Sequence, residues 1–337
     1  MNYSFSRLAV ACCFCATLTT AFGAKSKEAV ARVTRAEPFK GKTSFALGAF
    51  RVAFITEDKV TSVARGGSTG GASSLMTGQL VGVDHALMQK ISDEIYADFL
   101  KQATGKGLTI VDSVKLAQIS PVYSAMEAAE NFSEGRLGTV VIPTGQRSVT
   151  LAADNSAKAQ RGAANLMAGI HDIGVMNAKA EANKAFPEAS KEAGVPVLGV
   201  TIVVNFANFK GGVSRYGTTA KATILAGATI DGSNGVTSAT SIVGWDSKTY
   251  VCAACMGQVA LIGQVHSNTS IGALETHSTM KRGDHIANGI GALTGSGGQT
   301  KKKGAVLTAD PSAYETNVLV VAAQANQILL SGLSKGK

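Results

Sequence analysis

An apolar stripe between residues 84 and 105 has the spacing of an amphipathic helix. Its members recur at every fourth position: Leu87, Ile91, Ile95 and Phe99. Asp84 can accept hydrogen bonds from the free amides of the first turn, and Gly105 is typical of a helix end. The pattern predicts a helix that packs one face against a sheet.

Other apolar segments predict that sheet. Ser44–Thr56 is apolar on both faces except at Arg51, as expected of a central strand covered on both sides. Val195–Phe209 has the same character, and Lys210–Gly212 predicts a turn after it. Further elements are expected at residues 108–111 (strand), 122–132 (helix), 139–142 (strand), 156–193 (helical composition) and 310–337 (amphipathic helix). The order of strands and helices predicts an α/β fold.

Two stretches alternate between apolar and polar positions. Residues 219–230 do so before a turn expected at Asp231–Gly235, and residues 249–265 alternate again. Such alternation predicts either a strand of a membrane barrel or a long, twisted strand of a soluble sheet. For the barrel, the lipid-facing candidates are Val251, Val259, Leu261 and Val265, and the lumen-facing candidates are Tyr250, Gln258, Gln264 and His266.

Two glycine-rich segments are expected to be loops. Residues 62–82 show no clear periodicity, which is typical of a functional or mobile loop. Residues 283–304 are rich in Gly and Lys and end at Lys301–Lys303.

The N-terminus predicts export. Arg7 precedes the uncharged apolar stretch Leu8–Phe22, and small residues lead to a cleavage site before Ala24. We expect a signal peptide over residues 1–23 and a basic tether over residues 24–43. A buried N-terminal helix, a membrane anchor and lipidation of a leader cysteine are the alternatives.

The composition fits a folded protein. Hydrophobic residues make up 45% and charged residues 16% of the 337 residues, which excludes a disordered polyelectrolyte. The formal net charge is +9, but the basic segment at residues 24–43 lacks interleaved aromatic side chains, so we expect no nucleic-acid partner. No apolar run of about 18 residues follows the leader, so any membrane crossing is expected to use strands.

The sequence holds no sharp catalytic motif. Cys252 and Cys255 form a C-x-x-C pair, but residues three apart on a regular strand point to opposite faces, which favours two packed small residues over a redox or metal site. Gly289–Gly295 misses the dinucleotide-binding pattern by one residue. We expect no catalytic residues, no metal and no cofactor.

In the order of these elements the chain resembles the curli secretion channel (CsgG) family and its periplasmic α/β relatives. The similarity covers most of Ser44–Leu333 and includes the strands, the first helix, a transmembrane-like region from Ser247 to about Met280, and the terminal helix.

The resemblance implies a ring of identical subunits, each giving strands to a shared outer-membrane β-barrel. It also implies a pore narrowed by the loop before the first helix, here Ser73–Leu80. The constriction candidates are Leu75, Met76, Gln79 and Leu80. This loop has no aromatic residue and the leader has a poor lipobox, which puts a lipid anchor and a curlin-type substrate in doubt.

The expected fold class is α/β (α+β): a periplasmic mixed sheet with flanking helices, plus strands that contribute to an oligomeric membrane β-barrel. After the leader and tether, the expected layout is an α/β domain (44–246), barrel strands (247–282), a Gly/Lys-rich loop (283–309) and a C-terminal helix (310–337).

The expected function is an outer-membrane pore or export component for an extracellular or adhesive polypeptide. It would reside in the outer membrane or periplasm of a Gram-negative bacterium, with itself, the exported polypeptide and the membrane as partners. The alternatives are a soluble periplasmic or cell-surface module that binds a partner, and an exported enzyme.

Overall fold

The computed structural model describes residues 29–64, 72–126, 128–135, 138–148, 182–213, 220–232, 240–248, 256–281, 284–285, 288 and 300–335. The following predicted features lie outside the described residues: the leader, residues 156–181 of the stretch of helical composition, most of the expected turn after Asp231, Tyr250, Val251, Cys252, Cys255 and Gly289–Gly295.

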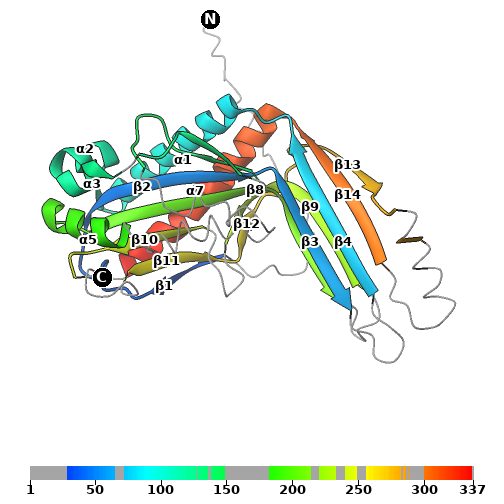
Figure 1. Ribbon diagram of the computed structural model, residues 1–337, viewed down its shortest axis with the longest axis horizontal. Coiled ribbons are helices and arrows are strands. Elements are labelled where there is room, and N and C mark those ends of the chain that lie inside the picture. Colours follow the sequence, from blue (N-terminus) through cyan, green and yellow to red (C-terminus); the bar gives the residue numbers. More distant parts are fainter. Residues whose placement is uncertain are drawn as a thin grey trace, which may run out of the picture.

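A mixed sheet, sheet A, forms the body of the molecule (Figure 1). Its strands β2 and β8 run parallel through the middle, while β8 pairs antiparallel with β10 on its other side. The strand order is β1 (Val30–Thr34), β11 (Gly257–Ile262), β10 (Ser241–Trp245), β8 (Val197–Val213), β2 (Ser44–Ile55), β7 (Gly138–Val141) and β6 (Phe132–Gly135). Off this path, β5 (Thr109–Val111) pairs with the start of β2, and β9 (Ala220–Asp231) pairs with β8 and β12 (Gln264–His266).

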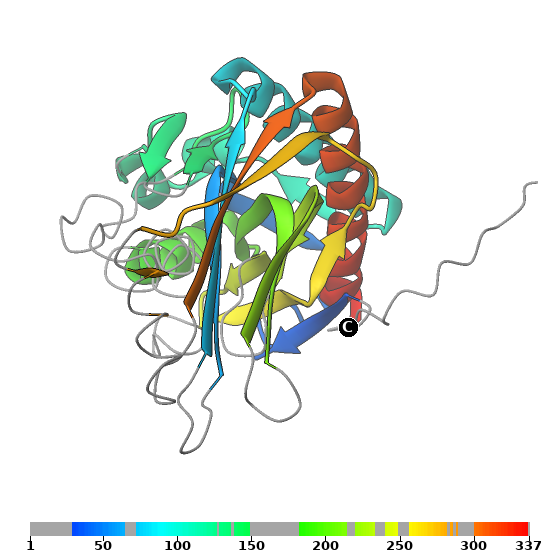
Figure 2. The same cartoon turned by 90° about the vertical axis from the view of Figure 1, so that its right-hand side faces the viewer.

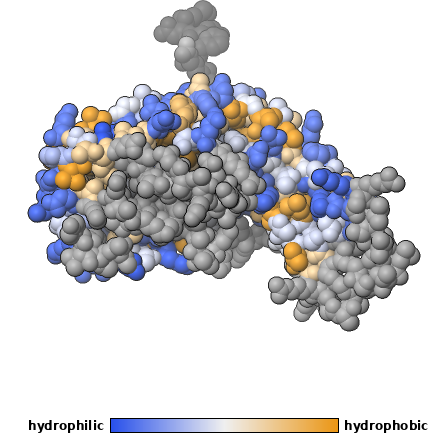
Figure 3. All heavy atoms as spheres, in the orientation of Figure 1, coloured by the Kyte–Doolittle hydropathy of each residue, from blue (hydrophilic) through white to orange (hydrophobic). Residues whose placement is uncertain are grey.

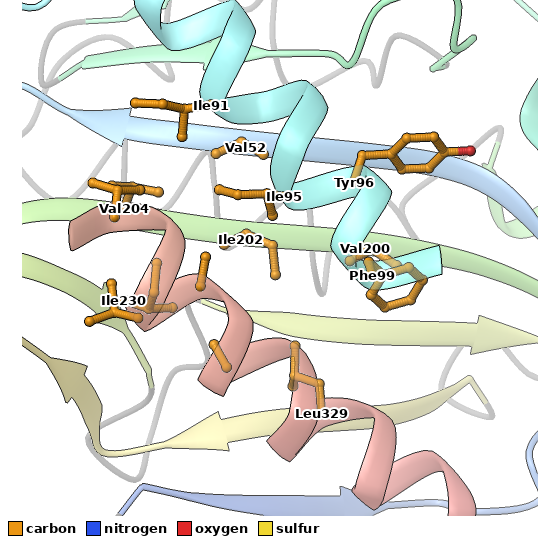
Figure 4. Packing of buried hydrophobic residues seen from close by; sticks show 14 of the residues in the cluster. Val52, Ile91, Ile95, Tyr96, Phe99, Val200, Ile202, Val204, Ile230 and Leu329 are labelled. Atoms are coloured by element: carbon orange, nitrogen blue, oxygen red, sulfur yellow. The ribbon is translucent and has the colours of Figure 1, made fainter. Parts of the chain in front are cut away.

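Two long helices cover one face of sheet A. Helix α1 (His85–Gly105) begins at Asp84, whose carboxylate accepts a hydrogen bond from the Leu87 amide at 2.8 Å, and α7 (Pro311–Lys335) packs beside it. In Figure 4, Ile95 of α1 and Leu329 of α7 lie over the sheet, and both are buried. Burying a side chain of this size contributes about 1.5–3 kcal/mol, so this layer supplies much of the stability.

Three shorter helices cover the opposite face at one end of the sheet: α2 (Ser113–Ile119), α3 (Pro121–Ala125) and α5 (Ala182–Ala193). Tyr123 and Phe186 are buried there with Trp245 of β10. The Tyr123 hydroxyl donates to the Gly48 carbonyl at 2.7 Å, which ties α3 to β2. The body is therefore a helix–sheet–helix sandwich at this end.

A second sheet, sheet B, projects from the body together with the far ends of β8 and β9 (Figures 1 and 2). Its order is β13 (Gly272–Ser278), β14 (Thr300–Ala309), β4 (Ala72–Val81) and β3 (Glu57–Ala64). The pair β4–β14 is parallel and the other two pairs are antiparallel.

The predicted α/β class is confirmed, and the strongest patterns gave the right elements. The central strand, the helix after Asp84 and the C-terminal helix all form. The helix α7 also has the length and apolar composition of a membrane span, but half of that stretch is buried inside the protein, as in a core helix.

The prediction of a loop over residues 62–82 is wrong for residues 62–64, which end β3, and 72–81, which form β4; residues 65–71 lie outside the described residues. The two strands pair with each other and pack small and apolar residues against β8 and β9. The prediction of a Gly/Lys-rich loop over residues 283–309 is wrong for residues 300–309, which form β14.

Other boundaries also differ from the predictions. The basic tether contains β1, which pairs with β11 at the edge of sheet A, and the turn predicted at Lys210–Gly212 is absent from β8, which continues to Val213. Of the helix predicted at 122–132 only the start forms, within α3, whose first residue is Pro121 after the cap Ser120, and Phe132 begins β6. The alternating stretch at 249–265 is divided at Gly263, where φ is +84°.

Candidate functional site

The candidate site is the projecting end of the molecule, which we call the strand extension. It consists of sheet B and the far ends of β8 and β9, residues 205–213 and 220–229, packed as two layers. The β8–β9 hairpin is continuous with sheet A, whereas β3–β4 is inserted between β2 and α1 and β13–β14 precedes α7. Figure 2 shows the strands of both layers side by side.

The facing surfaces of the two layers are apolar. Met76 and Ala305 of sheet B are buried against Ala222 of β9, with Phe209 and Ile224 packed at their border. The fit is close at Gly78, where an added Cβ would lie 2.6 Å from the Phe209 ring. Alternation along the strands therefore gives each layer one apolar face, and the two apolar faces cover each other.

The outward surfaces are mostly polar but carry two exposed apolar side chains, Val63 on β3 and Leu225 on β9. On sheet B the alternate residues Glu57, Lys59 and Thr61 are exposed, and on the other layer Lys210 and Lys221 are exposed. In the view of Figure 3, hydrophilic and apolar residues are interspersed over the described part of this end. Each layer is thus amphipathic at the period of a β-strand.

Few hydrogen bonds cross between the layers. The Ser62 hydroxyl of β3 donates to the Gly212 carbonyl of β8 at 2.6 Å, and the Ala222 amide of β9 donates to the Ser74 hydroxyl of β4 at 3.1 Å. These bonds use side chains on sheet B, so separation of the layers would leave the backbone pairing within sheet B intact.

The four constriction candidates lie on β4 and do not point into a common opening. Met76 and Leu80 are buried, Leu75 is half-buried, and only Gln79 is exposed. The prediction that they form a loop is wrong, because this segment pairs with both β3 and β14.

Gln79 lines a groove on the outer face of sheet B. The groove has a volume of about 230 Å³ and is open to solvent along one side. It is lined by Glu57, Thr77, Gly78, Gln79, His277, Gly304, Ala305 and Val306. A carboxylate, an imidazole and an amide around glycines suit a polar peptide or side chain better than an apolar ligand.

The described lipid-facing candidates lie inside the body, and Val251 lies outside the described residues. Val259 and Leu261 are fully buried in the main core and Val265 is nearly so. A Cβ added to Gly332 of α7 would come within 2.4 Å of Val259, so α7 covers this strand. The prediction of barrel strands at 247–282 is therefore wrong for β11 and β12, which are parts of sheet A.

The described lumen-facing candidates also belong to sheet A, and Tyr250 lies outside the described residues. Gln258 is half-buried on β11. On β12, Gln264 donates from Nε2 to Asp231 Oδ1 at 2.7 Å, and His266 Nδ1 lies 2.7 Å from the Thr229 hydroxyl. Gln264 and His266 therefore stabilise the contact between β12 and β9.

Gln264 is part of a buried polar cluster at the base of the strand extension. Asn205 of β8 donates from the same Nδ2 to Asp58 Oδ2 of β3 at 2.7 Å and to Asp231 Oδ2 of β9 at 2.9 Å. One amide thus bridges two carboxylates, and four strands from both sheets meet there. We call Asp58, Asn205, Asp231 and Gln264 the junction cluster.

Both acids of the junction cluster hold their protons more tightly than usual. Burial raises the pKa of Asp231 to about 6; the hydrogen bond from Asn205 opposes this, while the neighbouring Asp58 carboxylate adds to it. Burial also raises the pKa of Asp58, against the hydrogen bonds from Asn205 and the Lys59 amide. The pKa of His266 is lowered by burial and by Lys210.

Sequence reasoning missed this cluster. Asn205 interrupts the apolar run of β8, which is a readable signal of a buried polar contact, but Asp231 was assigned to a turn. Their partner Asp58 is far away in sequence, so only the fold brings the three together. Among the described residues no group of three or more His, Cys, Asp or Glu side chains is placed to hold a metal ion.

The geometry of the candidate site is that of a packed, two-layered strand extension joined to an α/β body through the half-buried Asp58 and the buried Asp231. Searches against protein-family models, curated proteins and solved structures match nothing to this chain.

Proposed function

We propose that this chain is a subunit of an oligomeric outer-membrane pore that exports an extracellular or adhesive polypeptide, and that it stores its membrane strands as the two layers of the strand extension. The observation that carries the proposal is the apolar-to-apolar packing of two amphipathic strand layers that project from the body. The resemblance to curli secretion channels in element order supports the same proposal.

The strand lengths fit this role. A membrane-spanning strand needs about 9–11 residues with alternating apolar and polar positions. β9 has 12 residues, and its inward Ala222 and Ile224 alternate with Lys221 and Thr223. Separated layers would present their apolar faces to lipid and their polar faces to an aqueous lumen.

Oligomerisation supplies the remaining requirement. Strands in lipid need all their backbone amides and carbonyls paired, which an isolated hairpin does not achieve. Closing the strands of several subunits into one barrel pairs them all. The packed layers are therefore the form that a single subunit adopts before assembly, and the barrel is the form that follows.

A second candidate is a soluble module that binds a partner protein. The groove on the outer face of sheet B favours it, because Glu57, Gln79 and His277 offer polar contacts on a surface that is formed while the layers are closed. In this alternative the layers stay together during function.

Locking the layers together distinguishes the two candidates. A Cβ built on Gly211 lies 3.6 Å from the Ser62 Cβ, within the range of a disulfide, so Ser62→Cys with Gly211→Cys joins β3 to β8. The variant is made in a background with Cys252→Ser and Cys255→Ser, and the mature protein is added to vesicles of outer-membrane lipid that contain a dye.

A pore subunit releases dye when the pair is reduced and loses that activity when it is oxidised, while each single cysteine variant stays active under both conditions. If the oxidised protein inserts as well as the reduced one, layer separation is not needed and the proposal fails. Absence of insertion by the reduced protein and by the parent would favour the soluble module.

A further inference from the structure

The junction cluster lies where opening of the strand extension must begin. Asp58 belongs to β3, the first strand of sheet B, whereas Asn205 and Asp231 belong to β8 and β9. The hydrogen bond from Asn205 to Asp58 therefore crosses from the β8–β9 layer to sheet B. Any separation of the layers that starts at the base breaks it.

The two carboxylates of the cluster are held by hydrogen bonds from amide side chains and not by ion pairs. Two amides, from Asn205 and Gln264, donate to the two carboxylates, and no cationic side chain among the described residues bonds either acid. With one acid protonated, the cluster carries one negative charge on a set of amide donors. With both ionised, two like charges share the Asn205 amide in a buried place, which is unfavourable.

The surrounding elements hold few other charges that act on this pair. From β3, Lys59 contributes its backbone amide and its side chain is exposed on the other face of the strand. From β12, His266 faces Thr229, and Lys210 of β8 acts on His266. On α7, which packs on β9 and β12, Glu315 pairs with Lys90 of α1 at 2.6 Å.

We propose that the junction cluster is a pH-sensitive latch, which holds the two layers of the strand extension closed while one acid is protonated and loosens them when both acids are ionised. The part assigned to opening rests on the proposed function, but the latch itself is a property of the soluble subunit. Its direction is fixed by the chemistry: acid closes the latch, and neutral pH releases it.

The size of the effect follows from Asp231. A pKa near 6 in the closed state, against 3.8 for an ordinary carboxyl, corresponds to a change of up to about a hundredfold in the opening equilibrium between pH 4 and pH 7. The opening equilibrium stops changing about one pH unit above the pKa of Asp231 in the closed state.

Labelling of a thiol between the layers measures opening directly. Ala305→Cys, in the background with Cys252→Ser and Cys255→Ser, places a thiol on the buried inner face of sheet B, where Ala305 is 3% exposed. Thr61→Cys on the exposed outer face gives the reference rate at each pH. The ratio of the two maleimide labelling rates, measured without membranes from pH 4.5 to 7.5, reports the open fraction.

The latch predicts that this ratio rises by ten- to a hundredfold as the pH passes 6, and that Asp231→Asn, which is neutral at every pH, makes the profile flat. Asp58→Asn is the second variant, used should Asp231→Asn fold poorly. It removes the neighbouring charge but leaves Asp231 buried, so it should reduce the rise. Glu275→Gln, which removes an exposed carboxylate from the same sheet, is the matched control and retains the rise.

A flat ratio in the parent, or a rise that is neither abolished by Asp231→Asn nor reduced by Asp58→Asn, overturns the latch. Because no membrane is present, that result leaves the pore proposal standing. Conversely, failure of the disulfide-locked protein to lose vesicle activity overturns the pore proposal and leaves the latch untouched.

Discussion

The free energy of unfolding should depend on pH through Asp231. This carboxyl is buried in the native state and its pKa there is about 6, whereas in the unfolded chain it returns to its ordinary value near 3.8. The native state therefore binds the proton more tightly than the unfolded chain. The stabilisation is complete below pH 4 and is lost as the pH rises through about 6.

The magnitude follows from the two pKa values. A difference of roughly two units, at about 1.4 kcal/mol each, gives about 3 kcal/mol as the largest loss of stability between pH 4 and pH 7. His266 acts in the opposite direction, because its lowered pKa adds stability as the pH rises. Asp231→Asn leaves His266 in place, so the difference between variant and parent isolates the acid.

Urea unfolding at pH 4.5 and pH 7.5 checks this prediction. The single tryptophan, Trp245, is buried in the body and reports unfolding by fluorescence, and circular dichroism follows the sheets. Relative to the parent, Asp231→Asn should gain about 2–3 kcal/mol between the two pH values. Equal changes in the two proteins would refute the reasoning about burial at the junction cluster.

Three further substitutions test other parts of the fold. Val259→Lys should prevent folding of the body, with loss of the cooperative melt, because it puts a charge into a fully buried position beside Gly332 of α7, at a cost of several kcal/mol. Phe209→Ala should weaken the contact with Gly78 by about 2 kcal/mol, less than for a fully buried ring, and should speed dye release from vesicles while leaving the Trp245 fluorescence transition in place. Asp84→Ala should lower stability by about 1 kcal/mol through loss of the α1 cap, seen as a lower melting temperature; an unchanged value would contradict the cap.

Local patterns predicted the body of the protein well. The spacing of apolar residues in α1 fits a helix with one covered face, and the apolar run of β2 fits a strand covered on both sides. The sequence predicts the start of α1 correctly, because the capping carboxylate of Asp84 accepts a hydrogen bond from an amide of the first turn.

The strand extension could not be predicted in the same way. The segment of β4 is rich in small residues, which give a weak hydrophobic signal, and its partners β3 and β14 lie on opposite sides in the sequence. The alternation at 249–265 cannot distinguish lipid-facing residues from buried ones. A strand covered by one helix and a strand of a membrane barrel both alternate with a period of two residues. Only tertiary packing distinguishes the two structures, and here α7 packs over Val259.

The central claim is that the inward face of the strand extension meets lipid. An environment-sensitive fluorophore is attached through single cysteines substituted in turn for Lys221, Ala222, Thr223 and Ile224 of β9, and its emission is recorded as vesicles are added. The account predicts a blue shift at Ala222 and Ile224 and little change at Lys221 and Thr223. Emission that shifts equally at all four positions, or at none while the protein binds the vesicles, would contradict it.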